Sequence, residues 1–256
     1  MTDGLLARLP AALRSRRDVL SDRERWAAAR VVASDDHAAV LVRDVGDGPA
    51  VWAVGDPGSL GTLLPPALVA HAAGARWVTA PRDVPVPPKA LAAAGVVRRT
   101  AWDRLTSAAP PRPVEGEGAV RALDPDRDTA AIAACLDAAN PATQARPGAD
   151  DDAAWWGVEG EHDDLLGVIG VAWRGGVAGD RSVHLHGLGV VPAARGRGLG
   201  TALTAVATRR ALEGGAPWAS LGMYADNAAA RHVYLSLGFA VDVENAGYGP
   251  PGADRP

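Results

Sequence analysis

The chain has 256 residues, 48% of them hydrophobic and 22% charged, which is the composition of a globular protein with a sizeable core. Its length suggests somewhat less than two full domains. The net charge of −4 argues against a general nucleic-acid binder, and the single cysteine, Cys135, excludes a disulfide framework and a cysteine-based zinc site.

The N-terminal segment has charges scattered through it and no apolar stretch of signal-peptide length. Nowhere do about eighteen apolar residues run without interruption by charge, glycine or proline. We therefore expect a cytoplasmic protein that has no membrane partner.

The first half of the chain predicts an alternating order of strands and helices, β-α-β-α-β. Its strands are expected at 50–54, 76–80 and 97–102, and its helices at 63–73 and 89–94. Four tryptophans follow each other at intervals of 26, 25 and 25 residues: Trp26, Trp52, Trp77 and Trp102. This spacing fits either an internal duplication or a coincidence of tryptophan placement.

A stretch rich in proline and glycine, residues 108–118, is the best candidate for a linker. The charge differs on its two sides, because residues 1–115 carry 15 basic and 12 acidic side chains whereas residues 116–256 carry 11 and 18. We therefore expect two domains, at 1–110 and 118–248, with the acidity in the second.

The second half predicts the order β-α-β-β-β-α-β-α-β, which implies a mixed α/β sheet with helices on its faces. Strands are expected at 119–123, 155–158, 165–173, 182–191, 218–224 and 239–243. Helices are expected at 128–139, 198–213 and 227–237, and an acidic loop at 147–152.

The strongest chemical signal is the loop between the strand ending at Val191 and the helix beginning at Gly198. It reads Pro-Ala-Ala-Arg-Gly-Arg-Gly-Leu-Gly-Thr over residues 192–201. Glycines let a backbone approach a ligand closely, and the N–H groups at a helix start attract anions. Arg195 and Arg197 add positive charge suited to phosphate. The loop therefore predicts a pyrophosphate cradle, and the alternative is a tight strand-to-helix connection with surface arginines.

This loop differs from two common nucleotide-binding loops. It has no Gly-Lys-Ser/Thr of a Walker loop and no G-x-G-x-x-G followed by an acidic residue about twenty positions on. A nucleotide-phosphate site stays an alternative, which predicts that the loop binds ATP or NAD.

The same stretch resembles the R-x-x-G-x-G signature of the GNAT acetyltransferase superfamily, here Arg195, Gly198 and Gly200. About thirty residues downstream, Asn227 leads a predicted helix that carries Tyr234 and ends at Leu-Gly-Phe, which is similar to the superfamily's second signature. Two motifs in this order are more specific than either alone. The resemblance covers residues 118–248 and implies the GNAT acyl-CoA acyltransferase fold there.

The resemblance implies that acetyl-CoA is the cosubstrate and that its pantetheine arm lies between two splayed strands, here 184–191 and 218–224. The backbone that would pair with the arm, and could stabilise an oxyanion, belongs to Leu188, Gly189 and Val190. The backbone that would hold the pyrophosphate belongs to Arg195, Gly196, Arg197, Gly198, Leu199, Gly200 and Thr201. Asn227 would cap its helix and also reach this ligand. No metal is expected.

Tyr234 lies seven residues after Asn227, two helical turns along and therefore on the same helix face. A phenol of ordinary pKa, about 10, is protonated at neutral pH and can donate its proton to a departing thiolate. The resemblance implies this role for Tyr234. The alternative is an aromatic side chain of the core.

His184 and His186 are two residues apart on a predicted strand, so both side chains are expected on one face. Either could accept a proton from an ammonium nucleophile, because histidine titrates near neutrality. The alternative is a pair of half-buried strand residues. Nearby acidic side chains fit either a solvated turn or an attracting patch for a cationic amine: Glu159, Glu161, Asp163 and Asp164.

The first half bears a faint likeness to the second, because residues 55–64 end in a Gly-Thr-x-Leu pattern similar to that of residues 200–203. The first half lacks an arginine at the cradle position and has no Asn/Tyr helix. We therefore expect a smaller α/β domain there, either a degenerate GNAT-like half or an unrelated cap.

The resemblance implies an N-acetyltransferase that transfers an acetyl group from acetyl-CoA directly to an amine in a ternary complex. The alternative is a non-catalytic protein that binds or senses acyl-CoA. The acceptor is expected to be a small-molecule or protein amine, without a nucleic-acid partner.

Overall fold

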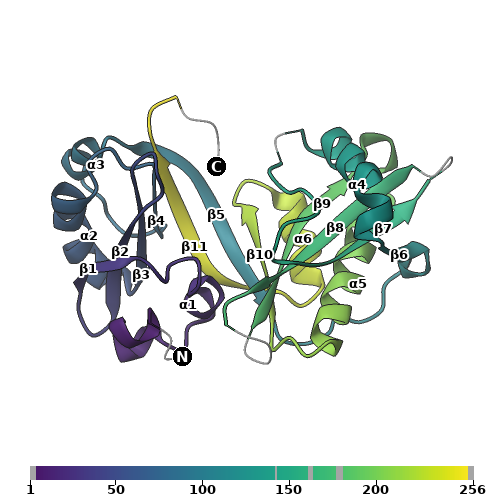
Figure 1. The fold of residues 1–256 in the computed structure, drawn as a ribbon, viewed down its shortest axis with the longest axis horizontal. Helices are drawn as coiled ribbons and strands as arrows, with labels where there is room; N and C mark the ends of the chain where they lie inside the picture. Colours follow the sequence, from purple (N-terminus) through teal and green to yellow (C-terminus); the bar gives the residue numbers. More distant parts are fainter. Residues whose placement is uncertain (1–3, 142, 161–163, 177–180, 253–256) are drawn as a thin grey trace. The chain divides into compact units, whose positions relative to one another are not determined.

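The computed structural model describes residues 4–141, 143–160, 164–176 and 181–252, whose helices and strands are shown in Figure 1. Contacts within the chain separate it into two compact units. Unit 1 comprises Met1–Arg104, Tyr224–Asp226 and Asp242–Pro256; unit 2 comprises Leu105–Met223 and Asn227–Val241. Each unit has its own hydrophobic core. The two domains predicted at 1–110 and 118–248 stay a prediction.

Unit 1 is a sheet with helices packed on it. Its helices are α1 (Arg17–Asp22), α2 (Pro57–His71) and α3 (Pro88–Ala94). Its strands are β1 (Arg30–Ser34), β2 (Ala38–Asp44), β3 (Pro49–Gly55), β4 (Trp77–Pro81) and most of β5 (Val97–Ser107) and β11 (Ala240–Gly249). The sheet order is β1-β2-β3-β4-β11-β5, with β3 and β4 parallel.

The β-α-β-α-β order predicted for the first half is present as β3, α2, β4, α3 and β5. Helix α2 begins at Pro57 rather than at the predicted residue 63, because the Asp56 carboxylate accepts the N–H of Ser59 at 2.8 Å and caps the helix there. The sequence pattern does not predict α1, β1 or β2. Of these, α1 is too short for hydrophobic periodicity to reveal it.

In unit 2 the strands lie between helices. Its helices are α4 (Pro125–Ala139), α5 (Leu199–Glu213) and α6 (Ala228–Ser236). Its strands are β6 (Val120–Leu123), β7 (Asp152–Glu159), β8 (Leu165–Arg174), β9 (Ser182–Val190) and most of β10 (Ala219–Tyr224). The sheet order is β6-β7-β8-β9-β10, antiparallel except for the parallel pair β9 and β10. The predicted element order and the mixed α/β class are confirmed.

Alternation along β8 sends neighbouring side chains to opposite faces of this sheet. Val168 packs in the cluster that contains Ile132 and Leu136 of α4, whereas Ile169 packs in the cluster that contains Leu203 of α5. Helices α4 and α5 therefore cover opposite faces, as Figure 1 shows for this unit.

Several element boundaries differ from the prediction, and two more of them have a clear cause. Helix α4 begins at Pro125 rather than at residue 128, because the Asp124 carboxylate accepts the N–H of Asp126 at 2.9 Å. Strand β11 continues to Gly249 rather than ending at residue 243, because its later residues pair with β4, from Asn245 opposite Pro81 to Tyr248 opposite Val78. That pairing is tertiary, so local apolar patterning does not reveal it.

Candidate active site

Strands β9 and β10 pair only at one end. Their parallel register runs from Val183 and Ala219 to Leu185 and Leu221, and beyond Leu185 strand β9 continues to Val190 without this partner. The edge of β9 that precedes the glycine-rich loop therefore lies open on the β10 side. This early end of the pairing fits the splayed pair of strands that the resemblance implies.

A bulge in β9 coincides with the opening. Gly187 has a φ of 58°, and the register between β8 and β9 shifts between Val168 and Gly170. A Cβ on Gly187 would lie 2.9 Å from Trp155, and one on Gly170 would lie 2.6 Å from the His186 ring. Glycine is therefore needed at both positions to leave room for these two rings.

The loop after β9 presents open backbone at the start of α5. Gly196 and Gly198 have φ values of 75° and 78°, and a Cβ at either position would meet no atom within 4 Å. Gly198 is the N-cap of α5, and as a glycine it has no side chain to accept a hydrogen bond from the N–H groups of the first turn. The first backbone hydrogen bond of the helix runs from the Ala202 N–H to the Gly198 carbonyl. The N–H groups of the first turn, Leu199 to Thr201, thus suit an anionic ligand.

The two loop arginines differ in what they contact. The Arg195 guanidinium donates to the carbonyl oxygens of Val190 at 3.2 Å and of Ala139, the last residue of α4, at 2.9 Å. Its donors thus hold the loop to the end of β9 and to the negative end of α4. Arg197 is exposed on the same loop. The expectation that both side chains serve a phosphate therefore fits Arg197 better than Arg195.

Asn227 caps α6, as predicted, because its Oδ1 accepts the N–H of Ala230 at 3.0 Å. Further along this helix, Tyr234 is 8% exposed and packs against Phe239, with ring centroids 6.1 Å apart. Burial raises the pKa of Tyr234 to about 12. The phenol therefore holds its proton at neutral pH, as a proton donor must, and its role as catalytic acid stays a prediction.

His184 is held in one tautomer by its neighbour on β10. Its Nδ1 lies 3.1 Å from Ser220 Oγ, and Ser220 directs its own O–H to the carbonyl of Val183, also at 3.1 Å. The serine oxygen is left as the acceptor, so Nδ1 carries the proton. In neutral His184 the lone pair is therefore on Nε2.

His186 faces a carboxylate. Its Nε2 lies 3.3 Å from Asp152 Oδ1, and its ring meets Trp155 edge-on with centroids 5.0 Å apart. The contact is electrostatic, because neither of these two atoms has a well-aligned hydrogen-bond partner among the described residues. Burial lowers the pKa of His186, and the Asp152 charge opposes that shift. His186 is thus neutral at pH 7, with Asp152 favouring the proton on Nε2 and the lone pair on Nδ1.

Asp152 is fixed by its second oxygen. Oδ2 accepts the indole N–H of Trp155 at 3.0 Å and the backbone N–H of Gly148 at 2.9 Å. The sequence does not single out Asp152, Trp155 or Ser220, because their link to the histidines depends on strand register. An aspartate three residues before a tryptophan does not by itself indicate that either side chain contacts a histidine.

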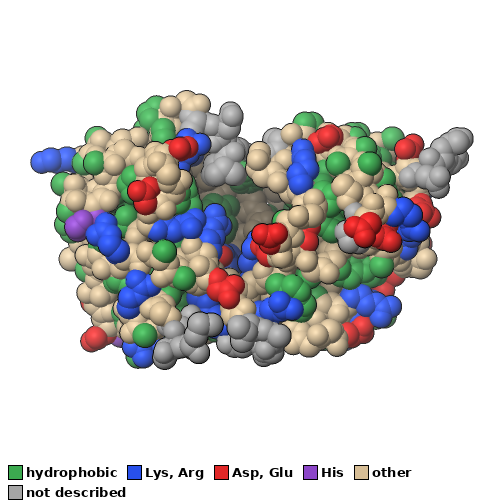
Figure 2. Space-filling view, in the orientation of Figure 1, with side chains coloured by type: hydrophobic (Ala, Val, Ile, Leu, Met, Phe, Trp, Pro, Cys, Tyr) green, Lys and Arg blue, Asp and Glu red, His purple; other side chains and the backbone are tan. Residues whose placement is uncertain are grey.

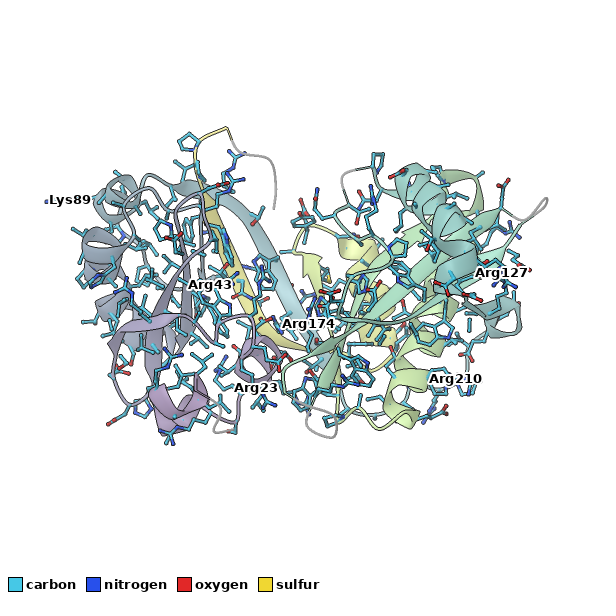
Figure 3. The ribbon with its side chains drawn as sticks, viewed as in Figure 1. Arg23, Arg43, Lys89, Arg127, Arg174 and Arg210 are labelled. Carbon is cyan, nitrogen blue, oxygen red and sulfur yellow. The ribbon has the colours of Figure 1, made fainter. Side chains whose placement is uncertain are left out.

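Both histidines line one cavity of about 540 Å³ in unit 2, so their expected common face is observed. Asp151 and Asp152 also line it, together with Arg174, which ends β8, pairs with Asp151 and is labelled in Figure 3. The cavity thus brings a neutral imidazole, carboxylates and a guanidinium together in one place. It is suited to a polar acceptor that must lose a proton.

Glu159 is one of the acidic side chains that the sequence analysis considers as an attracting patch for a cationic amine. Glu159 accepts a hydrogen bond from Arg121 Nε at 2.6 Å, which neutralises its charge. Glu161 and Asp163 lie outside the described residues. Figure 2 shows acidic and basic side chains interspersed over unit 2 on the face drawn. For Glu159 the contact favours a structural role over an attracting patch.

Within the described part of the chain, no group of three or more His, Cys, Asp or Glu side chains is placed to hold a metal ion. None of the helices in the same residues has the length and apolar character of a membrane-spanning segment.

Solved structures share this fold over most of the chain. A GCN5-related N-acetyltransferase from Kribbella flavida has a TM-score of 0.58 at 22% identity and covers 95% of this chain and 97% of its own. A tandem GNAT protein from the clavulanic acid biosynthesis pathway has a TM-score of 0.51 at 16% identity, covering 96% and 90%. The fold is therefore that of the GNAT class.

The family model of the acetyltransferase (GNAT) family matches residues 121–239. Residues 121–239 therefore belong to the GNAT family. Curated relatives are mycothiol acetyltransferases, from Streptomyces griseus (34% identity, 50% of this chain and 45% of the relative) and Amycolatopsis mediterranei (36% identity, 40% and 36%). The matches thus span less than half the length of these relatives.

Proposed function

We propose that this protein is an N-acetyltransferase that transfers an acetyl group from acetyl-CoA directly to an amine acceptor. The observation that carries the proposal is the early end of the β9–β10 pairing, directly before a helix start with open backbone N–H groups. This geometry lies inside the segment that matches the GNAT family.

The residues present fit acetyl-CoA. The open edge of β9 offers the backbone of Leu188, Gly189 and Val190 to an extended pantetheine arm. The loop backbone from Arg195 to Thr201 offers N–H groups, and the space above Gly196 and Gly198 leaves room for phosphate. Arg197 supplies charge, and Asn227 supplies the cap of α6 together with an amide that can face the same ligand.

The two proton transfers are assigned to His186 and Tyr234, and a third side chain, His184, is assigned to acceptor binding. His186 Nδ1 takes the proton of the acceptor's ammonium group, which leaves an amine to attack the thioester carbonyl. Tyr234 donates its phenolic proton to the departing thiolate, and the nitrogen of the new amide releases its extra proton, which restores the phenol. His184 lines the same cavity and binds the acceptor.

Direct transfer is supported by the state of the single cysteine. Cys135 is 3% exposed, and burial raises the pKa of its thiol to about 11. It is therefore a protonated core residue at neutral pH and a poor nucleophile. A cytoplasmic location is part of the proposal, because acetyl-CoA is an intracellular metabolite.

Release of free CoA thiol over a panel of amines tests the proposal. The panel should include amino acids, aminoglycosides, a lysine peptide and a mycothiol-type amine, because the curated relatives are named for mycothiol. We expect acceptor-dependent thiol release from acetyl-CoA. Tight acetyl-CoA binding by calorimetry with no turnover on any amine would instead identify a sensing protein, and no binding at sub-millimolar concentration would remove the cosubstrate.

A further inference from the structure

The four regularly spaced tryptophans line one small cavity of unit 1: Trp26, Trp52, Trp77 and Trp102. Register explains part of this convergence, because Trp52 on β3 pairs with Thr79 on β4, and Trp77 lies two residues before Thr79 on the same sheet face. The cavity has a volume of about 80 Å³, against about 540 Å³ for the cavity that contains the histidines of unit 2. It therefore has room for a small group rather than for an extended ligand.

Two guanidinium groups lie on these indole rings. The Cζ of Arg25, which lines the cavity, is 5.3 Å from the ring centroid of Trp77. The Cζ of Arg43, labelled in Figure 3, is 5.0 Å from the ring centroid of Trp26 and 6.0 Å from that of Trp77. Arg43 also donates a hydrogen bond to the backbone carbonyl of Arg25 at 2.8 Å, which ties the two residues together. Attraction to an indole face holds a guanidinium in place but does not neutralise its charge.

Neither Arg25 nor Arg43 forms an ion pair with another residue in the part of the chain that the structure describes. Burial and the nearby charge of Arg25 lower the pKa of Arg43, although the charge of Asp22 opposes this shift. Two like charges held this close repel each other, and an anion beside them is attracted to both.

The two carboxylates of the cavity wall have partners of their own. Asp18 accepts two hydrogen bonds from Arg16, at 2.9 and 3.0 Å, and one from a backbone N–H of α1 at 2.9 Å. Asp22 forms an ion pair with Arg104. Arg25 is left as the charged side chain of the wall that has no opposite partner among the described residues. The wall therefore favours an anion over a cation.

A buried amide opens into the same cavity. Asn245 on β11 lines the cavity and is only 4% exposed. Its side chain forms no hydrogen bond with any other described residue, and its amide is not enclosed by protein, so a group in the cavity can reach it. A polar side chain buried this far needs a hydrogen-bond partner. Thr79, which is half-buried, adds a hydroxyl to the same wall.

We propose that this cavity binds a small oxyanion, a phosphate or carboxylate group. Arg25 provides the charged contact, and the Asn245 amide and the Thr79 hydroxyl provide neutral donors. An oxyanion accepts several hydrogen bonds at once, which matches the guanidinium, amide and hydroxyl donors of this wall. The site consists of unit 1 residues alone, so this proposal and the proposed function can fail separately.

The indole N–H signals of the tryptophans report binding at this place. In the full chain labelled with nitrogen-15 tryptophan, the signals of Trp77 and Trp102 are assigned from the variants Trp77→Phe and Trp102→Phe. Sodium phosphate and sodium acetate are each titrated to about 20 mM, because a few charge-assisted hydrogen bonds give a Kd in the millimolar range. Sodium chloride at equal ionic strength is the salt control.

We expect saturable shifts of both indole signals with at least one of the two oxyanions and none with chloride. A response to phosphate alone would support a phosphate-bearing ligand, and a response to acetate would support a carboxylate. No saturable shift with either oxyanion, or an equal shift with chloride, would overturn the proposal.

Variants then test the assigned contacts through the same two signals. Arg25→Gln should weaken oxyanion binding about tenfold, the equivalent of one charge-assisted hydrogen bond, and the isosteric Thr79→Val should weaken it by a smaller factor. Arg197→Gln is the matched control, because it removes an exposed arginine of unit 2 and should leave this affinity unchanged. Thermal unfolding checks that each variant is folded, and Thr79→Val remains informative should Arg25→Gln fail to fold. Unchanged affinity in both cavity variants, or an equal loss in Arg197→Gln, would contradict the assignment.

Discussion

At the scale of single residues, the account depends on groups that stay neutral at pH 7. Tyr234 keeps its proton because burial raises its pKa to about 12, and His186 stays unprotonated because burial lowers its pKa. One group can therefore donate a proton and the other can accept one at the same pH. This is the opposed pair that general acid–base catalysis requires.

Replacing Tyr234 by phenylalanine removes the proton donor and keeps the ring that packs against Phe239. We expect kcat to fall about 100-fold, with little change in the KM for acetyl-CoA, because a catalytic proton transfer contributes roughly 100-fold or more. Steady-state kinetics measure both. Tyr248→Phe is the control, since Tyr248 is also buried but lies in unit 1. An unchanged kcat in Tyr234→Phe would contradict the acid role.

Asp152→Asn tests the base through its pH dependence. The Asp152 charge raises the pKa of His186, so removing it lowers that pKa further. Activity carried by neutral His186 is lost as the pH falls through this pKa. The acid limb of kcat/KM should therefore move to lower pH in the variant, while the plateau drops because the base is weaker. Asp151→Asn, on the rim beside Arg174, should move the limb much less, and equal shifts in both variants would argue against the assignment.

Some residues of the candidate site can be predicted from the sequence, and others cannot. Gly198 and Asn227 are recognisable because their roles at helix starts follow from local chain order. Asp152 and Ser220 are not recognisable, because Ser220 meets His184 across the β9–β10 pair and Asp152 on β7 meets His186 on β9 across the intervening strand β8. Partners of candidate site residues that are fixed by strand register therefore cannot be predicted from the sequence alone.

At the scale of elements, the loop from β9 to α5 depends on glycines with positive φ. Gly198→Ala places a side chain in the left-handed region and should cost about 1 kcal/mol of folding free energy. It should also raise the KM for acetyl-CoA, because the loop backbone must move. Gly215→Ala is matched to it, with a φ of 95° and open space at the end of α5. Equal KM values in the two variants would show that the loop does not hold the ligand.

Arg195 joins three elements, since its guanidinium reaches the end of β9 and the end of α4 from the loop before α5. Arg195→Gln should lower Tm, with a loss of about 1 kcal/mol for the two bonds. Arg197→Gln should instead leave Tm unchanged and raise the KM for acetyl-CoA. Calorimetric melting and kinetics separate the two effects. The opposite pattern would reverse the roles given to the two arginines.

Element prediction succeeded where a local signal exists. The helix at 198–213 and the strands at 165–173 and 182–191 carry enough apolar pattern and glycine punctuation to be found. The sequence pattern predicts too short a strand β11, because Glu244 to Gly249 are mostly polar or small and become a strand only by pairing with β4. Helix starts at Pro57 and Pro125 were missed because the capping aspartates lie before the apolar periodicity.

At the scale of the whole molecule, one family assignment covers only part of the chain. Residues 121–239 belong to the GNAT family, whereas fold similarity to GNAT proteins extends over more than nine-tenths of the chain. A degenerate GNAT-like origin for the first half fits this fold similarity and stays a prediction. The last strand, from Asp242 onward, groups with unit 1, which no local pattern in the sequence indicates.

The central claim is that acetyl-CoA binds where β9 parts from β10 and at the start of α5. Hydrogen–deuterium exchange on the full chain, with and without saturating acetyl-CoA, measures this directly. The account predicts slower exchange of the backbone amides at 187–190 and 196–201 in the complex. Exchange that is unchanged in both segments, while calorimetry shows the ligand bound, would contradict it.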